Sequence, residues 1–83
     1  MSQRYVIHLP VIAADLPAAQ RLARVVGRWM LVLPMADPGE TTVSEEDAQF
    51  LRHRVFCDRL MPGGRRCLLR DGHDGDCSRR LRR

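Results

Sequence analysis

The sequence predicts a single small domain of the α+β class. A strand–helix–strand–helix part is expected over residues 1–56, followed by a hairpin or loop module over 57–77. Short apolar runs alternate with stretches of helical spacing in the first two thirds of the chain. All three cysteines lie in the last third, together with one histidine. A chain of 83 residues buries only about 60–65% of the surface that its unfolded form exposes, so an additional staple is expected.

The first expected element is a strand over Arg4–Leu9. Apolar and β-branched residues dominate this run, and Pro10 ends it. Its near-continuous apolar character indicates burial on both faces. His8 lies inside the run and is interpreted as a core or edge histidine rather than as a ligand.

A helix is expected from about Leu16 to Arg28. Asp15 is placed to cap it, and Pro17 lies in its first turn. Gly27 and the basic residue after it fit a helix end. Apolar residues recur along one face at helical spacing: Ala19, Leu22, Ala23 and Val26.

The opposite face of this helix carries Arg21, Arg24 and Arg28, with no acidic residue among them. Two interpretations stay open. The arginines could form an ordinary solvated face, or a stripe that meets phosphates or an acidic partner.

A second apolar strand is expected over Trp29–Leu33, ended by Pro34, with a turn over Asp37–Glu40. The order strand, helix, strand predicts a small right-handed unit in which the two strands are parallel. Because two strands alone are marginal, the C-terminal hairpin is expected to extend the sheet.

The second helix is expected from Ser44 to about Phe56. Ser44 is a suitable N-cap, and the acidic run Glu45–Asp47 suits the first turn of a helix. Val43 can pack on Ala48 as a hydrophobic staple. This helix would lead the chain directly to the first cysteine.

The cysteines and the histidine of the last third have the spacing C-x9-C-x5-H-x3-C, formed by Cys57, Cys67, His73 and Cys77. Thiolate and imidazole are the ligands that zinc prefers, and a Cys3His set closes a tetrahedral shell. The spacing therefore predicts a structural zinc site rather than a catalytic one, which would keep a position open for water. Zinc would be the staple, because zinc-finger peptides bind it with about 10–16 kcal/mol.

Turn residues lie between these ligands. Pro62–Gly64 supplies a turn, and a three-residue loop over Met61–Gly63 would place Cys57 opposite Cys67. Gly72 and Gly75 bracket the histidine and permit a tight backbone path around an ion. Two other interpretations remain for the cysteines: one disulfide plus a free thiol, or unrelated buried thiols.

Charge is distributed unevenly along the chain. Residues 1–53 carry five arginines and six acidic residues, whereas residues 54–83 carry nine arginines and four acidic residues. The C-terminal part is therefore the basic one, and residues 78–83 are expected to form a mobile basic tail. No apolar run approaches the ~18–20 residues that span a membrane, and no signal peptide is expected, so a soluble cytoplasmic protein is predicted.

The sequence indicates no enzyme. It contains no glycine-rich phosphate loop and no Ser/His/Asp arrangement, and its C-terminal aspartates do not match a calcium loop.

The segment from Cys67 to Cys77 resembles a short signature, C-x-L-x-x-G-H-x-G-x-(C/H), of small zinc-binding proteins from high-GC bacteria and their phages. The resemblance covers about a quarter of the chain, from Cys57 onward. It implies zinc ligation by Cys57, Cys67, His73 and Cys77. The Cys-Cys-His-Cys order is also similar to zinc knuckles, which bind single-stranded nucleic acid. Knuckles place their first two cysteines two residues apart, whereas nine residues intervene in this chain.

Two functions are consistent with the sequence. The first is a nucleic-acid-binding or regulatory module that contacts the phosphates of DNA or RNA. The second is a phage-type adaptor or inhibitor that binds an acidic surface of a host protein. Either would use the same basic residues: Arg59, Arg65, Arg66, Arg70, Arg79, Arg80, Arg82 and Arg83.

Overall fold

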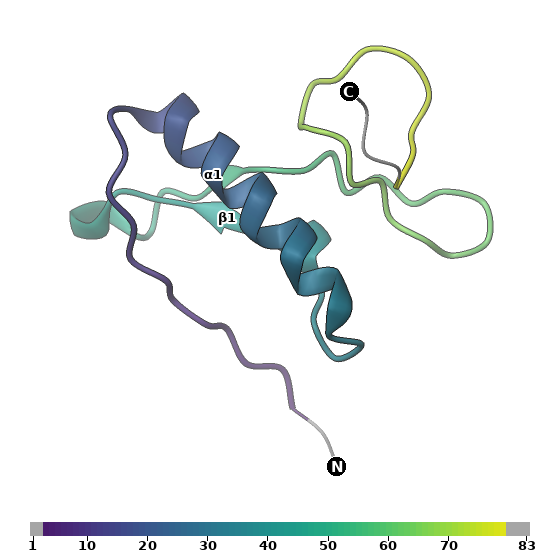
Figure 1. The fold of residues 1–83 in the computed structure, drawn as a ribbon, viewed down its shortest axis with the longest axis horizontal. Coiled ribbons are helices and arrows are strands. Elements are labelled where there is room, and N and C mark those ends of the chain that lie inside the picture. The colour runs from purple at the N-terminus through teal and green to yellow at the C-terminus, as the bar shows by residue number, and fades with distance from the viewer. Residues whose placement is uncertain (1–2, 80–83) are drawn as a thin grey trace.

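A computed structural model of the chain describes residues 3–79 and shows one α-helix with a two-stranded antiparallel sheet. The helix is α1 (Leu16–Trp29), and the strands are β1 (Thr42–Val43) and β2 (His53–Arg54). Helix α1 crosses the sheet, and the C-terminal residues form two irregular loops to one side of it (Figure 1). The α+β class is thus confirmed in outline. The described secondary structure also includes three short 3-10 helices: Met30–Val32, Pro38–Glu40 and Glu46–Ala48.

Helix α1 begins where the sequence predicts. Asp15 has extended backbone angles, and its carboxylate accepts a hydrogen bond of 2.8 Å from the N–H of Ala18. Its end is also close to the expected one, because α1 continues through Gly27 to Trp29, one residue beyond Arg28. Gly27 is buried against Phe56, and a Cβ atom at this position would lie 2.7 Å from the ring. The glycine therefore allows close packing and does not end the helix.

The core lies between α1, the sheet and the C-terminal loops. Val55, Phe56 and Leu68 are buried together, and Ala23 of α1 and Val43 of β1 pack against them. The side-chain amide of Gln20 also joins the helix to β2 by donating to the carbonyl of Arg54 at 2.9 Å. The N-terminal part and the C-terminal loops therefore share one core.

The strand expected at Arg4–Leu9 does not form. This segment is extended, but it makes no backbone hydrogen bond with another described residue. Ile7 is 93% exposed, and His8 is exposed as well. The prediction was wrong because an apolar run does not itself supply a neighbouring strand. The arginine of the run forms ion pairs instead, with the carboxylates of Asp37 and Glu40.

The strand expected at Trp29–Leu33 is also absent. Helix α1 ends at Trp29, and the chain continues as the 3-10 helix Met30–Val32. The N–H of Leu33 donates to the carbonyl of Met30 and closes this turn. The parallel strand–helix–strand unit is therefore wrong. The turn at Asp37–Glu40 is present and contains the 3-10 helix Pro38–Glu40.

The second helix, expected over Ser44–Phe56, is reduced to the single 3-10 turn Glu46–Ala48. The chain then enters β2, which pairs with β1 in the register Thr42–Arg54 and Val43–His53. The residues after β2 enter the core, with Phe56 only 1% exposed. Burial in the tertiary core outweighs the local capping signals, which contribute about 1 kcal/mol.

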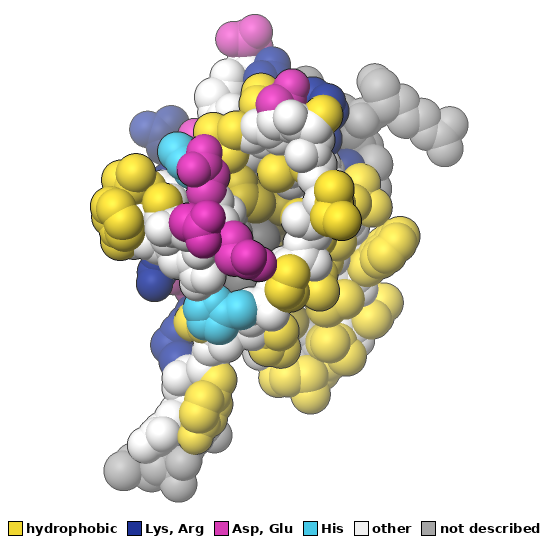
Figure 2. Space-filling model, turned by 90° about the vertical axis from the view of Figure 1, so that its left-hand side faces the viewer, with side chains coloured by type: hydrophobic (Ala, Val, Ile, Leu, Met, Phe, Trp, Pro, Cys, Tyr) yellow, Lys and Arg dark blue, Asp and Glu magenta, His cyan; other side chains and the backbone are white. Residues whose placement is uncertain are grey.

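Many apolar side chains remain on the surface. Figure 2 shows them gathered over one part of the visible face, beside a group of acidic side chains. The large apolar side chains with high exposure include Tyr5, Val6, Ile7, Ile12, Trp29, Val32, Met35 and Phe50.

Candidate metal centre

An irregular antiparallel ribbon carries the first two cysteines. Isolated bridges pair Phe56 with Arg70 and Leu60 with Arg66, and the N–H of Met61 donates to the carbonyl of Arg65 at 2.7 Å, which leaves a three-residue loop over 62–64. The loop has the expected length but begins one residue later than expected, so Cys57 does not lie directly opposite Cys67. The N–H of Cys57 donates to the carbonyl of Leu69 at 2.8 Å instead.

A backbone irregularity in the ribbon still brings the two sulfurs to one side. Asp58 has a φ of 56°, in the left-handed region that is uncommon for residues other than glycine. Its N–H donates to the carbonyl of Cys67 at 3.0 Å, and the N–H of Cys67 donates to the carbonyl of Arg59 at 2.9 Å. Backbone hydrogen bonds to Cys67 therefore fix both Asp58 and the residue that follows it.

The last two residues of the set lie on the loop that follows the ribbon. A turn from Arg70 to His73 begins this loop, closed by a 3.1 Å hydrogen bond between their backbones. Gly72 and Gly75 have φ values of 78° and 81°, so the glycines on either side of the histidine adopt the conformation expected of them. The N–H of Leu68 donates to the carbonyl of Ser78 at 2.9 Å, which brings the end of the loop back to the ribbon.

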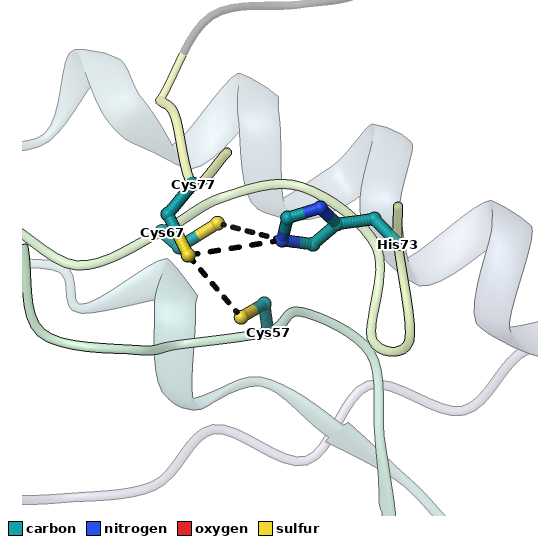
Figure 3. A group of neighbouring side chains, drawn as sticks. All are labelled: Cys57, Cys67, His73 and Cys77. Carbon is teal, nitrogen blue, oxygen red and sulfur yellow. Dashed lines mark hydrogen bonds between the residues drawn. The ribbon is translucent and has the colours of Figure 1, made fainter. Parts of the chain in front are cut away.

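The four side chains point toward one another (Figure 3). Their ligand atoms all lie within 4.8 Å of one another. The Nε2 atom of His73 is 3.4 Å from the sulfur of Cys67 and 3.9 Å from that of Cys77. The sulfurs of Cys57 and Cys77 are also 3.9 Å apart. The set predicted from spacing is therefore assembled in space, close enough to hold a metal ion.

The other ring nitrogen of His73 is held by the backbone. Nδ1 lies 3.1 Å from the carbonyl oxygen of Asp74. A carbonyl oxygen can accept a hydrogen bond but cannot donate one, so in the neutral ring Nδ1 carries the proton. Nε2 then keeps its lone pair and faces the three sulfurs. Such a contact fixes both the tautomer and the ring orientation of a metal ligand.

The acidities of Cys67 and Cys77 differ. Burial opposes ionisation of Cys67, but hydrogen bonds from the backbone at Leu69 and Ser78 and from the neighbouring thiols lower its pKa to about 7. Loss of solvent, the hydrogen bonds with the other cysteines and their negative charge raise the pKa of Cys77 to about 11. Thiolates this close repel one another, and a cation among them would favour ionisation of all three.

The alternative interpretations of the cysteines fit less well. All three are free thiols. The separation of 3.9 Å between the sulfurs of Cys57 and Cys77 is far from a disulfide bond of about 2.05 Å. Only Cys67 is fully buried, so the group as a whole is not part of the apolar core.

The arginines proposed for binding are spread around this module. Four of them are exposed: Arg59, Arg65, Arg66 and Arg70. Arg79 is half-buried and donates to the carbonyl of Arg66 at 3.2 Å, and Ser78 is held by the ribbon. These two residues of the expected tail are thus hydrogen-bonded to the ribbon. The remaining basic positions lie outside the described residues: Arg80, Arg82 and Arg83.

Sequence reasoning missed the backbone groups of the site. The carbonyl of Asp74 and the backbone at Leu69 and Ser78 contribute through main-chain atoms, which every residue type has. Only their positions in the folded loop identify them.

No family model, curated protein or solved structure matches this chain. Within residues 3–79, no helix has the length and apolar character needed to cross a membrane.

Proposed function

We propose that this chain is a small zinc-binding protein in which one structural Zn2+ closes the C-terminal module. The observation that supports the proposal is the convergence of three sulfurs and one imidazole nitrogen within 4.8 Å. Zinc lies about 2.3 Å from sulfur and 2.0–2.1 Å from nitrogen, so a tetrahedral site separates two sulfurs by about 3.8 Å and sulfur from nitrogen by about 3.6 Å. The contacts of 3.4–3.9 Å match these separations.

A structural role follows from the number of ligands. Four protein ligands complete a tetrahedral shell and leave no position for a substrate or a reactive water. The apolar core beside the site is small, with Val55, Phe56 and Leu68 as its buried cluster. Zinc binding would therefore stabilise the folded chain more than any contact within that cluster.

Metal analysis and cobalt substitution test this proposal. The purified protein is expected to contain one zinc per chain, and the Co2+ form is expected to show the visible absorption of a tetrahedral site with thiolate ligands. Cys77→Ser should weaken metal binding strongly. Asp76→Asn is the matched control, because Asp76 is exposed, precedes Cys77 in the chain and is not one of the four residues of the set. Protein that is purified without any bound metal and does not take up zinc would contradict the proposal.

We further propose that the basic surface of this module binds the phosphates of DNA or RNA. Arg59, Arg65 and Arg70 are exposed, and among the described residues none of them forms an ion pair with a carboxylate. Unpaired guanidinium groups are suited to phosphate oxygens. The same exposure would also suit an acidic protein surface, as in an adaptor or inhibitor.

The dependence of binding on salt separates these partners. Binding of generic DNA or RNA should weaken steeply with salt, and Arg59→Gln with Arg65→Gln should reduce the slope by up to about one unit for each lost contact. Arg52→Gln is the matched control, because Arg52 is exposed but precedes the basic part of the chain. If neither nucleic acid binds at about 50 mM salt, where phosphate contacts are strong, the adaptor function is favoured.

A further inference from the structure

A cavity of about 330 Å³ lies between α1 and the loop that carries His73. In Figure 3, α1 passes behind this loop. Two basic residues of the helix line the cavity, and one basic residue of the metal-binding module faces them. The complete lining is Arg24, Arg28, Leu69, Arg70, His73 and Asp74.

The cavity gathers positive charge that the protein does not neutralise. Three guanidinium groups line it against a single carboxylate, that of Asp74. Among residues 3–79, neither Arg24 nor Arg28 forms an ion pair, and nor does Arg70. Holding like charges together costs free energy, which a bound anion would recover.

The state of Arg24 is consistent with such crowding. Its pKa is lowered, first by partial burial and then by the positive charges of Arg28, Arg70 and Arg21. A group in this position gains more from an anionic ligand than a fully solvated arginine does, because it is partly withdrawn from water.

The negative charge of a zinc-loaded metal centre would not balance the positive charge of all three arginines. A Zn2+ ion with three thiolates carries one net negative charge, and Asp74 adds one more. The three arginines therefore still leave one positive charge in excess. Moreover, Arg24 and Arg28 come from α1, whereas the four metal-site residues lie on the ribbon and loop after Phe56.

We propose that this cavity binds a phosphate group, with Arg24, Arg28 and Arg70 as its ligands. A volume of about 330 Å³ is at the lower end of the range for small-molecule sites, about 300–1,000 Å³, and accommodates a phosphate with part of the group attached to it. The phosphate belongs either to a free nucleotide or to a nucleic-acid strand. The inference rests on the proposed zinc centre, because zinc would hold the loop that carries Arg70.

Titration with inorganic phosphate and with AMP, followed by calorimetry at low salt, tests the cavity directly. Arg24→Gln and Arg70→Gln should each weaken binding at least about tenfold, because each removes hydrogen bonds to a charged group. Two matched controls should change affinity less than about twofold, as is usual for surface charges. Arg21→Gln lies on the same helix outside the cavity, and Arg52→Gln changes an exposed arginine that also lies outside it.

Asp74→Asn provides a test in the opposite direction. It removes the one carboxylate of the cavity and keeps the backbone carbonyl that holds His73. This variant should bind phosphate more tightly, a result that damage to the fold would not produce. Phosphate binding weaker than about 10 mM, equal weakening by the control variants, or no gain in Asp74→Asn would each overturn the proposal.

Oligonucleotides with and without a 5′-phosphate identify the source of the phosphate. Preference for AMP and for the phosphorylated end indicates a terminal phosphate, whereas equal binding of both oligonucleotides indicates the backbone. Zinc content is measured for every protein used. Loss of phosphate binding with one zinc retained refutes the cavity alone. Phosphate binding by a protein that neither contains nor takes up zinc refutes the proposed metal centre and shows that the cavity forms without zinc.

Discussion

Close packing at single residues shapes this small protein. Gly27 lies inside α1, where glycine is unfavourable by about 0.8–1.0 kcal/mol relative to alanine. Its value is steric, because Phe56 occupies the space that a side chain would need. Gly39 has the same role beside Asp58, whose carboxylate oxygen a Cβ atom would overlap.

Gly27→Ala should destabilise the protein by about 1 kcal/mol. The added methyl group meets ring atoms of Phe56 at 2.7 and 2.8 Å, and such overpacking costs about 1–3 kcal/mol, which exceeds the gain in helix propensity. Urea unfolding measures the difference. Arg21→Ala, an exposed change on the same helix, should stay within about 0.5 kcal/mol. A Gly27→Ala protein that is more stable than the parent would show that the ring yields easily.

Elements differ in how much of their stability is local. Helix α1 has its own N-cap and a proline in its first turn, so its beginning is defined within a few residues. Strands β1 and β2 contain two residues each and depend on partners about ten residues away in the chain. The ribbon that carries Cys57 and Cys67 has only isolated bridges between its two sides.

Asp15→Ala should cost about 1 kcal/mol, because the amide of Ala18 then loses its acceptor. Asp15→Asn retains an oxygen at the same position and should lose much less. Thermal unfolding followed at the helix signal compares the two variants. Equal losses in both would mean that the negative charge at the helix end, rather than the hydrogen bond, provides the stabilisation.

For the whole molecule, the position of the core determines how the parts unfold. Ala23 of α1 and Val43 of β1 pack on the cluster of Val55, Phe56 and Leu68, in which Phe56 and Leu68 are the sequence neighbours of Cys57 and Cys67. The helix and the metal module should therefore not unfold independently.

Removal of the metal with a chelator should unfold α1 together with the C-terminal module. Trp29 is the only tryptophan and ends α1, so its fluorescence reports on the helix, while circular dichroism reports helix content. The two signals should change at the same chelator concentration, and added zinc should restore both. A helix signal that persists after metal loss would show that the first part of the chain folds alone.

Local interactions explain which predictions from the sequence succeed. The beginning of α1 follows from a cap and its neighbouring amides, all within one turn. The set Cys57, Cys67, His73 and Cys77 follows from residue type and spacing, because few side chains bind metal and the loop between them is short. Glycines near the histidine adopt the positive φ that the turn requires.

Tertiary structure alone decides the remainder. The apolar run at Arg4–Leu9 has the composition of a strand, yet no strand within residues 3–79 pairs with it. The capping signals at Ser44 do not produce an α-helix, because Val55 and Phe56 are buried in the core beside α1 instead. The meeting of Arg24 with Arg70 likewise depends on how the helix and the loop pack. Strand pairing and core burial join residues distant in the chain, so their free energies are not encoded in any short segment.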